Sequence, residues 1–165
     1  MIADAALTVE VTMPCAAWRQ ECADAAALVA DAARLALRRE AAPAEAVVDV
    51  TLADDAAQLD LNRIWRGKNA PTNVLAFPAA DPAMPPPPGA PLLLGDVVLA
   101  FETVCREAAE QQKPLSDHLR HLVVHGVLHL LGYDHIEAGD AAAMETREIA
   151  ILAELGVPNP YGDTM

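Results

Sequence analysis

The sequence predicts an α+β fold, an α/β sandwich in which a mixed four-stranded sheet packs with about five helices. Strand-like and helix-like segments alternate in the first half of the chain, and the second half is mostly helical. The 165 residues, 53% of them hydrophobic, can form one core, because domains usually contain roughly 100–150 residues. We therefore expect residues 1–165 to form a single domain.

Periodicity and composition identify the first two strands and the helices that follow them. Residues 7–11 alternate apolar and polar side chains, as a half-buried strand does, and residues 18–39 have the alanine-rich composition and periodicity of a helix. The β-branched segment 47–52 predicts a second strand. Asp54 or Asp55 then caps a second helix.

Glycine and proline divide the middle of the chain. The segment 67–71 ends the second helix near Trp65, and residues 72–77, which precede Pro78, predict a third strand. Residues 81–91 are too rich in proline to supply the amide donors of a sheet. We expect a proline-rich surface loop there, inserted within the domain.

One strand and three helices complete the predicted fold. Residues 92–99 resemble a fully buried strand interrupted by Gly-Asp, and a helix is expected at 102–112. A proline at the start and Gly132 after the end delimit the next helix, 114–131. The last helix is expected at 140–155.

Composition narrows the classes of function. The first residues lack the basic start and apolar centre of a signal peptide, and no apolar run reaches the roughly 20 residues that span a bilayer. We expect a cytoplasmic protein with no membrane partner.

The cysteines and the net charge exclude further classes of site. No C-x-x-C pair is formed by Cys15, Cys22 and Cys105, which argues against a disulfide framework or zinc knuckle. With 24 acidic and 11 basic side chains the net charge is −13, so nucleic acid could bind only at a local basic patch.

The helix expected at 114–131 carries a pattern of metal ligands. His125 and His129 are four residues apart, so their β-carbons lie about 5–6 Å apart on a helix, a span that one metal ion can bridge. Gly132 lets the chain turn back and positions His135 as the third ligand. We prefer this interpretation to ordinary core histidines, because unpartnered buried imidazoles would each cost about 1–3 kcal/mol. Three histidines with an open fourth position are typical of one catalytic Zn²⁺ per chain, used for hydrolysis.

The histidine spacing, with Gly132 inside it, is that of the metzincin peptidases, H-E-x-x-H-x-x-G-x-x-H, so we predict a metzincin-like zinc site on a central helix. Gly126 replaces the glutamate that serves those enzymes as general base. His118 and His121 lie on the same helical stripe. They either support the ligands or substrate, or are partly exposed polar residues, which is the simpler interpretation. Asp134 either orients a ligand and moves a proton, or stabilises the turn.

A short basic segment interrupts this acidic chain. No carboxylate occurs between Asp60 and Asp81, and Arg63, Arg66 and Lys68 fall within that interval. Arg66 and Lys68 lie where a helix gives way to a loop, and a guanidinium group matches the oxygens of a phosphate. The alternative is a solvated helix end, where the helix dipole favours cations.

Three sequence blocks resemble those of the YbeY family, bacterial zinc-dependent endoribonucleases that act in ribosomal RNA maturation. The blocks are LNRIWRGKNAPTNVLAFP at 61–78, LGDVV at 94–98, and HLVVHG followed by LHLLGYDH within 121–135. Their order and spacing agree across residues 45–155. The resemblance implies Zn²⁺ bound by His125, His129 and His135, and a functionally important arginine at Arg66. The family usually has serine where this chain has Ala76.

The same resemblance implies what the protein does and with which partners. It implies single-strand-specific cleavage of ribosomal RNA in 16S rRNA 3′-end processing and ribosome quality control, together with a small-subunit ribosomal protein and a ribosome-assembly GTPase. Our hypothesis is that water activated by zinc attacks the phosphodiester and that Arg66 stabilises the phosphoryl oxygens. Asp134, or a histidine that supports the ligands, moves protons. The ribose 2′-hydroxyl is an alternative nucleophile. A zinc peptidase with a replaced base, and a non-catalytic assembly factor with a structural metal, are the alternative functions.

Overall fold

The computed structural model describes residues 7–67, 72–79, 90–133 and 138–161, with only the backbone of Trp65, Arg66 and Ala138. The strands are β1 (Thr8–Thr12), β2 (Ala46–Ala53), β3 (Val74–Pro78) and β4 (Leu92–Ala100). The helices are α1 (Ala17–Glu21), α2 (Ala25–Arg39), α3 (Asp55–Arg66), α4 (Phe101–Glu110), α5 (Leu115–Leu130) and α6 (Ala138–Glu154). These elements confirm the predicted α+β composition.

The four strands form one mixed sheet, as predicted. Their order is β1-β2-β4-β3, in which β1, β2 and β4 are parallel and β3 is the antiparallel edge strand. The pairing of β2 with β4 shifts register between Val47 and Val48, beside the Gly-Asp interruption in β4. The sheet therefore places β3 at an edge, where one side of the strand is open to form a site.

The first predicted helix, 18–39, is wrong as a single element, because the chain leaves the helix at Cys22 and begins again after Asp24. The break allows Trp18 to bury completely while its indole Nε1 donates to the backbone oxygen of Ala53, 2.9 Å away. The ring also meets Phe101 edge-on at 5.1 Å between centroids. Contacts made 35 residues away in the chain thus outweigh the local helical preference.

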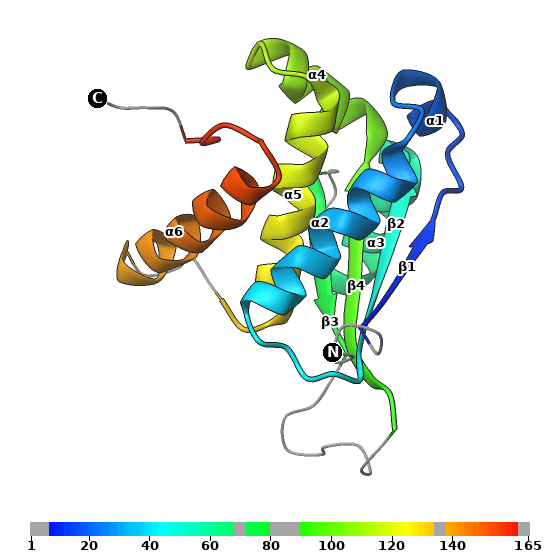
Figure 1. The fold of residues 1–165 in the computed structure, drawn as a ribbon. Coiled ribbons are helices and arrows are strands. Elements are labelled where there is room, and N and C mark those ends of the chain that lie inside the picture. Colours follow the sequence, from blue (N-terminus) through cyan, green and yellow to red (C-terminus); the bar gives the residue numbers. More distant parts are fainter. Residues whose placement is uncertain (1–6, 68–71, 80–89, 134–137, 162–165) are drawn as a thin grey trace.

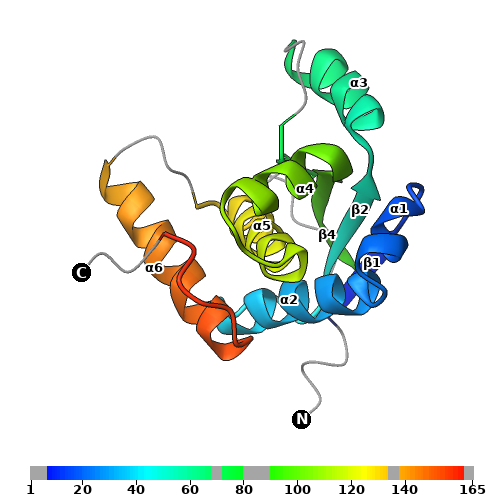
Figure 2. The same cartoon turned by 90° about the horizontal axis from the view of Figure 1, so that it is seen from above.

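The core lies between the sheet and helices α2 and α5 (Figure 2). Alternate side chains of β2 and β4 point into it, and α2 contributes mostly alanine, which lets the helix approach the sheet closely. Helix α6 packs against α5 and α2 on the outside of this layer, whereas α3 lies on the opposite face of the sheet. This arrangement buries α5 between the sheet and α6.

Helix α5 ends where the glycine predicts. Gly132 has a positive φ of 105°, its N–H donates to His129 O, and the next N–H, of Tyr133, donates to Leu128 O, each at 3.0 Å. These bonds satisfy carbonyl groups that the end of the helix leaves free. At the other end Pro114 is the N-cap, so the helix begins at Leu115, one residue after the predicted start.

Three further predictions concern the proline-rich loop, the cysteines and membrane-spanning helices. The predicted proline-rich loop, 81–91, lies outside the described residues except for its last two. The three cysteines are free thiols in this structure, and burial raises the pKa of the Cys105 thiol to about 11. None of the described helices is long and apolar enough to cross a membrane.

Candidate metal centre

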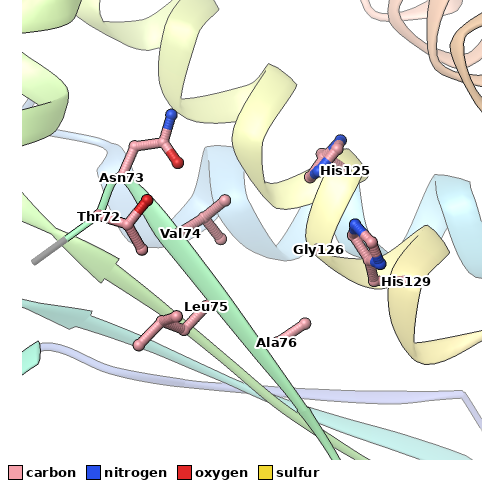
Figure 3. A pocket seen from close by; sticks show the side chains of 8 residues that line it. All are labelled: Thr72, Asn73, Val74, Leu75, Ala76, His125, Gly126 and His129. Carbon is pink, nitrogen blue, oxygen red and sulfur yellow. The ribbon is translucent and has the colours of Figure 1, made fainter. Parts of the chain in front are cut away.

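A pocket of about 280 Å³ lies between helix α5 and the edge strand β3 (Figure 3). Its helical wall carries two of the predicted ligands, and its other wall is the chain that enters and forms β3. The lining residues are Thr72, Asn73, Val74, Leu75, Ala76, His125, Gly126 and His129. The predicted metal ligands on α5 therefore face a cavity that can admit a substrate.

His125 and His129 project from neighbouring turns of α5 toward the pocket (Figure 3). Their ring centroids are 4.7 Å apart, with the rings inclined at 72°. Both residues are partly buried, between the apolar core of α5 and the open side of the pocket. The i, i+4 spacing that the sequence predicts thus brings two imidazoles together at one point of the surface.

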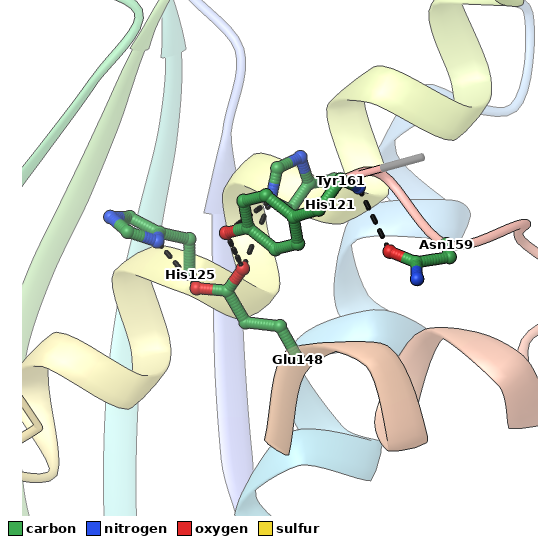
Figure 4. A network of polar contacts seen from close by, with 5 residues as sticks. All are labelled: His121, His125, Glu148, Asn159 and Tyr161. Atoms are coloured by element: carbon green, nitrogen blue, oxygen red, sulfur yellow. Dashed lines mark hydrogen bonds and ion pairs between the residues drawn. The ribbon is translucent and has the colours of Figure 1, made fainter. Parts of the chain in front are cut away.

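A buried carboxylate on α6 supports the first of these histidines (Figure 4). Glu148 is completely buried, and its Oε2 accepts a hydrogen bond of 2.6 Å from His125 Nδ1. Its Oε1 accepts from His121 Nε2 at 3.0 Å and from the Tyr161 hydroxyl. Burial alone would raise the pKa of Glu148, but the bonds from His121 and His125 outweigh it and lower the pKa to about 2. The carboxylate is therefore ionised and acts as an acceptor.

The hydrogen bond to Glu148 determines how His125 could bind a metal. With Nδ1–H donated to the carboxylate, the ring offers its lone pair at Nε2, the atom directed away from α6. Imidazole nitrogen is a preferred ligand of Zn²⁺. His125 and His129 therefore fit a zinc site, whereas the third predicted ligand, His135, lies outside the described residues.

The opposite wall of the pocket is fixed by two polar side chains from neighbouring helices. Gln58 of α3 is buried; it donates to Val98 O at 3.1 Å and accepts from Thr72 N at 2.8 Å. Glu107 of α4 accepts from Asn73 Nδ2 at 3.0 Å. These bonds hold the chain at the start of β3 across from the two histidines.

Helix α5 can approach the sheet closely at Gly126. A β-carbon added there would lie 2.7 Å from Val97 Cγ1 and 3.1 Å from Cγ2, closer than van der Waals contact permits. The position that holds the general base in metzincins therefore has no room for a side chain. A glutamate at this position would require α5 to move away from the sheet.

The simpler interpretation, partly exposed polar residues, is wrong for His118, which is buried, but it holds for His121, whose side chain is 13% exposed. The His118 side chain is only 3% exposed and its Nε2 lies 2.9 Å from Glu107 Oε1, while His121 is held by Glu148. Burial lowers the pKa of His118, although the bond to Glu107 opposes this shift. Both histidines therefore belong to the polar network behind the pocket.

The remaining predicted site residues are described only in part. Arg66 is the last residue of α3, and Gly67 follows it in a left-handed conformation with φ of 69°. The nearby Arg63 forms an exposed ion pair with Asp60 at 3.4 Å. Lys68 and Asp134 lie outside the described residues.

The sequence interpretation missed Glu148, Gln58 and Tyr161. A signal for Glu148 was present, because it falls among the buried residues Met144 and Ile151, spaced along one face of α6. A carboxylate within an apolar stripe needs a partner, which makes it a candidate for a polar site. Gln58 and Tyr161 carry no comparable signal, because their partners come from distant segments.

Comparison with known proteins identifies the family. Residues 15–156 match the family described as Endoribonuclease YbeY. The Endoribonuclease YbeY of Paramagnetospirillum magneticum (strain AMB-1) is 52% identical over 159 residues, which cover 95% of this chain and 97% of that protein. That of Magnetococcus marinus (strain MC-1) is 59% identical over 120 residues, covering 69% and 82%.

A solved structure supports the fold independently. The solution structure of TM1509 from Thermotoga maritima superposes with a TM-score of 0.59 and 20% sequence identity, and covers 94% of this chain and 96% of that one. At this identity the likeness concerns the fold alone. The family match and the long, highly identical relatives lead to one conclusion: this chain belongs to the Endoribonuclease YbeY family.

Proposed function

We propose that this chain is a zinc-dependent endoribonuclease that cleaves single-stranded RNA during ribosomal RNA maturation. The observation that carries the proposal is the pair His125 and His129 at the mouth of a pocket, with His125 backed by the buried carboxylate of Glu148. Relatives that align with nearly the whole chain are named Endoribonuclease YbeY. The paired histidines support metal-assisted hydrolysis, and the name of these relatives supports RNA as the substrate.

In this proposal His125, His129 and His135 hold one Zn²⁺ per chain. When bound, the ion supplies Lewis-acid chemistry, lowering the pKa of water to about 7 and polarising a phosphoryl oxygen. The remaining roles belong to side chains of the protein. Glu148 orients His125, while Gln58 and Glu107 fix the pocket wall at Thr72 and Asn73.

Two further residues are assigned to the RNA. Arg66 ends α3 only six positions before Thr72, which lines the pocket, and we propose that its guanidinium binds the phosphoryl oxygens. We assign proton transfer to Asp134, which directly precedes His135. We propose single-stranded RNA as the substrate, because its unstacked nucleotides can turn outward into a pocket of this kind.

The acidity of the chain supports a role within a larger assembly. A net charge of −13 opposes long-range attraction to RNA, so we propose that proteins on the ribosomal particle bring the enzyme to its substrate. The family resemblance suggests a small-subunit ribosomal protein and a ribosome-assembly GTPase as these partners. The proposed tasks are 16S rRNA 3′-end processing and ribosome quality control in the cytoplasm, performed by residues 1–165 as a single domain.

The peptidase alternative lacks a general base, because Gly126 occupies the position of the metzincin glutamate. A metzincin-type glutamate at this position would place its β-carbon 2.7 Å from Val97 Cγ1. None of the described pocket-lining residues is a carboxylate that could replace the missing base. The non-catalytic assembly factor differs from the proposal only in lacking cleavage, so an RNA cleavage assay separates the two.

The test compares RNA cleavage by metal-analysed, nuclease-free protein and variants, with a single-stranded fragment from the 3′ end of 16S rRNA. We expect His129→Ala to lose cleavage and Arg66→Ala to reduce it by about 100-fold or more, because a charge that stabilises the transition state is removed. Arg19→Ala is the matched control. It removes an exposed arginine from α1, next to the sheet edge opposite β3, and should leave cleavage unchanged.

Cleavage at the same rate in all four proteins would show that the activity does not come from this site. No cleavage by the zinc-loaded wild type would instead favour the assembly factor. The ends of the products identify the nucleophile, because a 2′,3′-cyclic phosphate requires attack by the ribose 2′-hydroxyl.

A further inference from the structure

We propose that Glu148 is a positioning residue that holds His125 in the Nδ1–H tautomer, so that Nε2 faces the pocket as a ligand atom. The inference rests on the proposed zinc site, and it adds a role for a residue on a different helix from His125. Figure 4 shows the arrangement, with the Glu148 carboxylate between α6 and the two histidines of α5.

The complete burial of Glu148 is better explained by a role in positioning His125 than by stability. Its side chain is 0% exposed and shares a face of α6 with Met144, Ile151 and Leu152, all of which are buried. A buried ionised carboxylate is expensive unless its oxygens are hydrogen-bonded, and an apolar residue of similar volume often stabilises a protein as well or better. Stability alone therefore does not explain a glutamate in this face.

The three donors to Glu148 fix the plane of its carboxylate. His121 Nε2, at 3.0 Å, and the Tyr161 hydroxyl both donate to Oε1, which leaves Oε2 directed at His125 Nδ1, 2.6 Å away. His121 and His125 lie one turn apart on α5, so the carboxylate spans one turn of that helix. The imidazole of His125 is thereby held at its Nδ1 edge. Rotation of the ring would break the 2.6 Å hydrogen bond to Glu148, which joins α5 to α6.

This bond selects one tautomer of His125. A neutral imidazole carries its proton on one nitrogen and its lone pair on the other, and only Nδ1–H can donate to the carboxylate. A carboxylate behind a metal-bound histidine also increases the basicity of the ligating nitrogen, and removing such a partner typically weakens metal affinity about 10–100-fold. We expect a loss of this size when Glu148 is replaced.

The C-terminal segment completes the network through Tyr161. Its hydroxyl donates to Glu148, and its ring meets that of His121 edge-on at 5.5 Å between centroids. Its backbone N–H donates to Asn159 Oδ1 at 2.9 Å, which fixes the turn that carries the ring. Because Tyr161 touches Oε1 and not the His125 bond itself, Tyr161→Phe should weaken zinc binding less than Glu148→Gln does.

The first experiment measures zinc affinity by competition with a chromophoric chelator. We expect Glu148→Gln, which keeps the size of the side chain, to bind zinc about 10–100-fold more weakly than wild type. Glu154→Gln is the matched control, because Glu154 lies on the same helix but is exposed and pairs with Arg39. Wild-type affinity in Glu148→Gln would overturn the inference, and weaker binding in both variants would show that the effect is not specific to Glu148.

The second experiment reads the tautomer of His125 in zinc-free protein at mildly alkaline pH, from the ¹⁵N chemical shifts of its ring nitrogens. In wild type we expect protonated Nδ1 and unprotonated Nε2, and in Glu148→Leu a shift toward Nε2–H. An Nε2–H tautomer in the wild type overturns the inference even if Glu148→Leu does not fold.

The two experiments also separate this inference from the function on which it rests. A wild type that binds no zinc refutes the metal site, while the tautomer still decides whether Glu148 positions the ring. Zinc binding that is lost in His129→Ala but unchanged in Glu148→Gln retains the metal site and removes the role of Glu148.

Discussion

Gly126 determines how closely α5 approaches the sheet, and so where the two histidines stand. A methyl group at this position would meet the side chain of Val97 at 2.7 Å. We expect Gly126→Ala to reduce the free energy of unfolding by about 1–3 kcal/mol, because the added atom overpacks the interface between α5 and β4. Urea unfolding of the zinc-free protein measures this.

The same substitution in α6 provides the control. An added β-carbon at Gly139 meets no atom within 4 Å, so Gly139→Ala should be neutral or stabilising by up to about 1 kcal/mol. If Gly126→Ala were as stable as Gly139→Ala, the close approach of α5 to Val97 would be contradicted.

His118 should make the protein less stable in mild acid. Burial lowers its pKa below the ordinary value of 6.5 against the opposing bond from Glu107, and Lys113 and His121 contribute further repulsion. As pH falls through 6.5 the unfolded chain takes up the proton first. The contribution of a neutral His118 is therefore complete above that pH and is lost progressively below it.

The variant His118→Gln removes this titration. Between about pH 7.5 and about pH 5.5 the free energy of unfolding of zinc-free wild type should fall more than that of His118→Gln, as measured by urea unfolding at each pH. Parallel curves for the two proteins would mean that His118 has the same pKa folded and unfolded.

The residues that could be predicted from sequence are those whose relation is local. The four-residue spacing of His125 and His129 places both on one face of a helix whatever that helix packs against. Glu148 could not be paired with His125 in advance, because the pairing depends on the angle at which α6 crosses α5. A residue 23 positions away in sequence becomes a neighbour only through tertiary packing.

At the scale of elements, the end of α5 determines the direction in which the chain continues after His129. Gly132 has φ of 105°, a conformation that costs about 1–3 kcal/mol for a residue with a side chain. Gly156, after α6, has φ of 78°, and a β-carbon at either glycine meets no atom within 4 Å. The two glycines therefore test backbone conformation without a steric clash.

We expect Gly132→Ala and Gly156→Ala each to destabilise the protein by about 1–3 kcal/mol. Only Gly132→Ala should also weaken zinc binding, because Gly132 lies between the proposed ligands His129 and His135. Calorimetric titration with zinc distinguishes the two variants. Equal zinc affinities would contradict the proposal that this turn sets the ligand geometry.

Helices and strands could be predicted because their hydrophobic residues recur at a regular spacing in the sequence. The order of the strands in the sheet could not be predicted in this way. Residues 47–52 and 92–99 were predicted as strands and pair in parallel as β2 and β4, yet β3 lies between them in sequence and at the edge in space. The division of 18–39 into α1 and α2 depends on the bond from Trp18 to Ala53. Strand order and this break are decided by contacts that no local pattern records.

At the scale of the whole molecule, the distribution of charge limits how tightly RNA alone can bind. At most three cations, Arg63, Arg66 and Lys68, occur in the basic segment before β3, in a chain of net charge −13. Three phosphate contacts on a single strand give a slope of about −2.1 in log affinity against log salt, a loss of roughly twentyfold between about 50 and 200 mM salt.

Binding of the 16S fragment to an uncleaving variant such as His129→Ala, measured by fluorescence anisotropy across this range, gives the slope. A loss of a thousandfold or more would require roughly seven or more phosphate contacts and would contradict a short basic patch as the RNA-binding surface.

The central claim is that one zinc ion, held by the histidines of the α5 pocket, is required for RNA cleavage. The most direct measurement titrates zinc into zinc-free protein and follows the rate of cleavage of the single-stranded 16S fragment. The proposed site predicts that activity rises from zero and saturates at about one equivalent of zinc per chain, and that His129→Ala stays inactive throughout. Full activity in the zinc-free protein, or equal activity in His129→Ala, would contradict it.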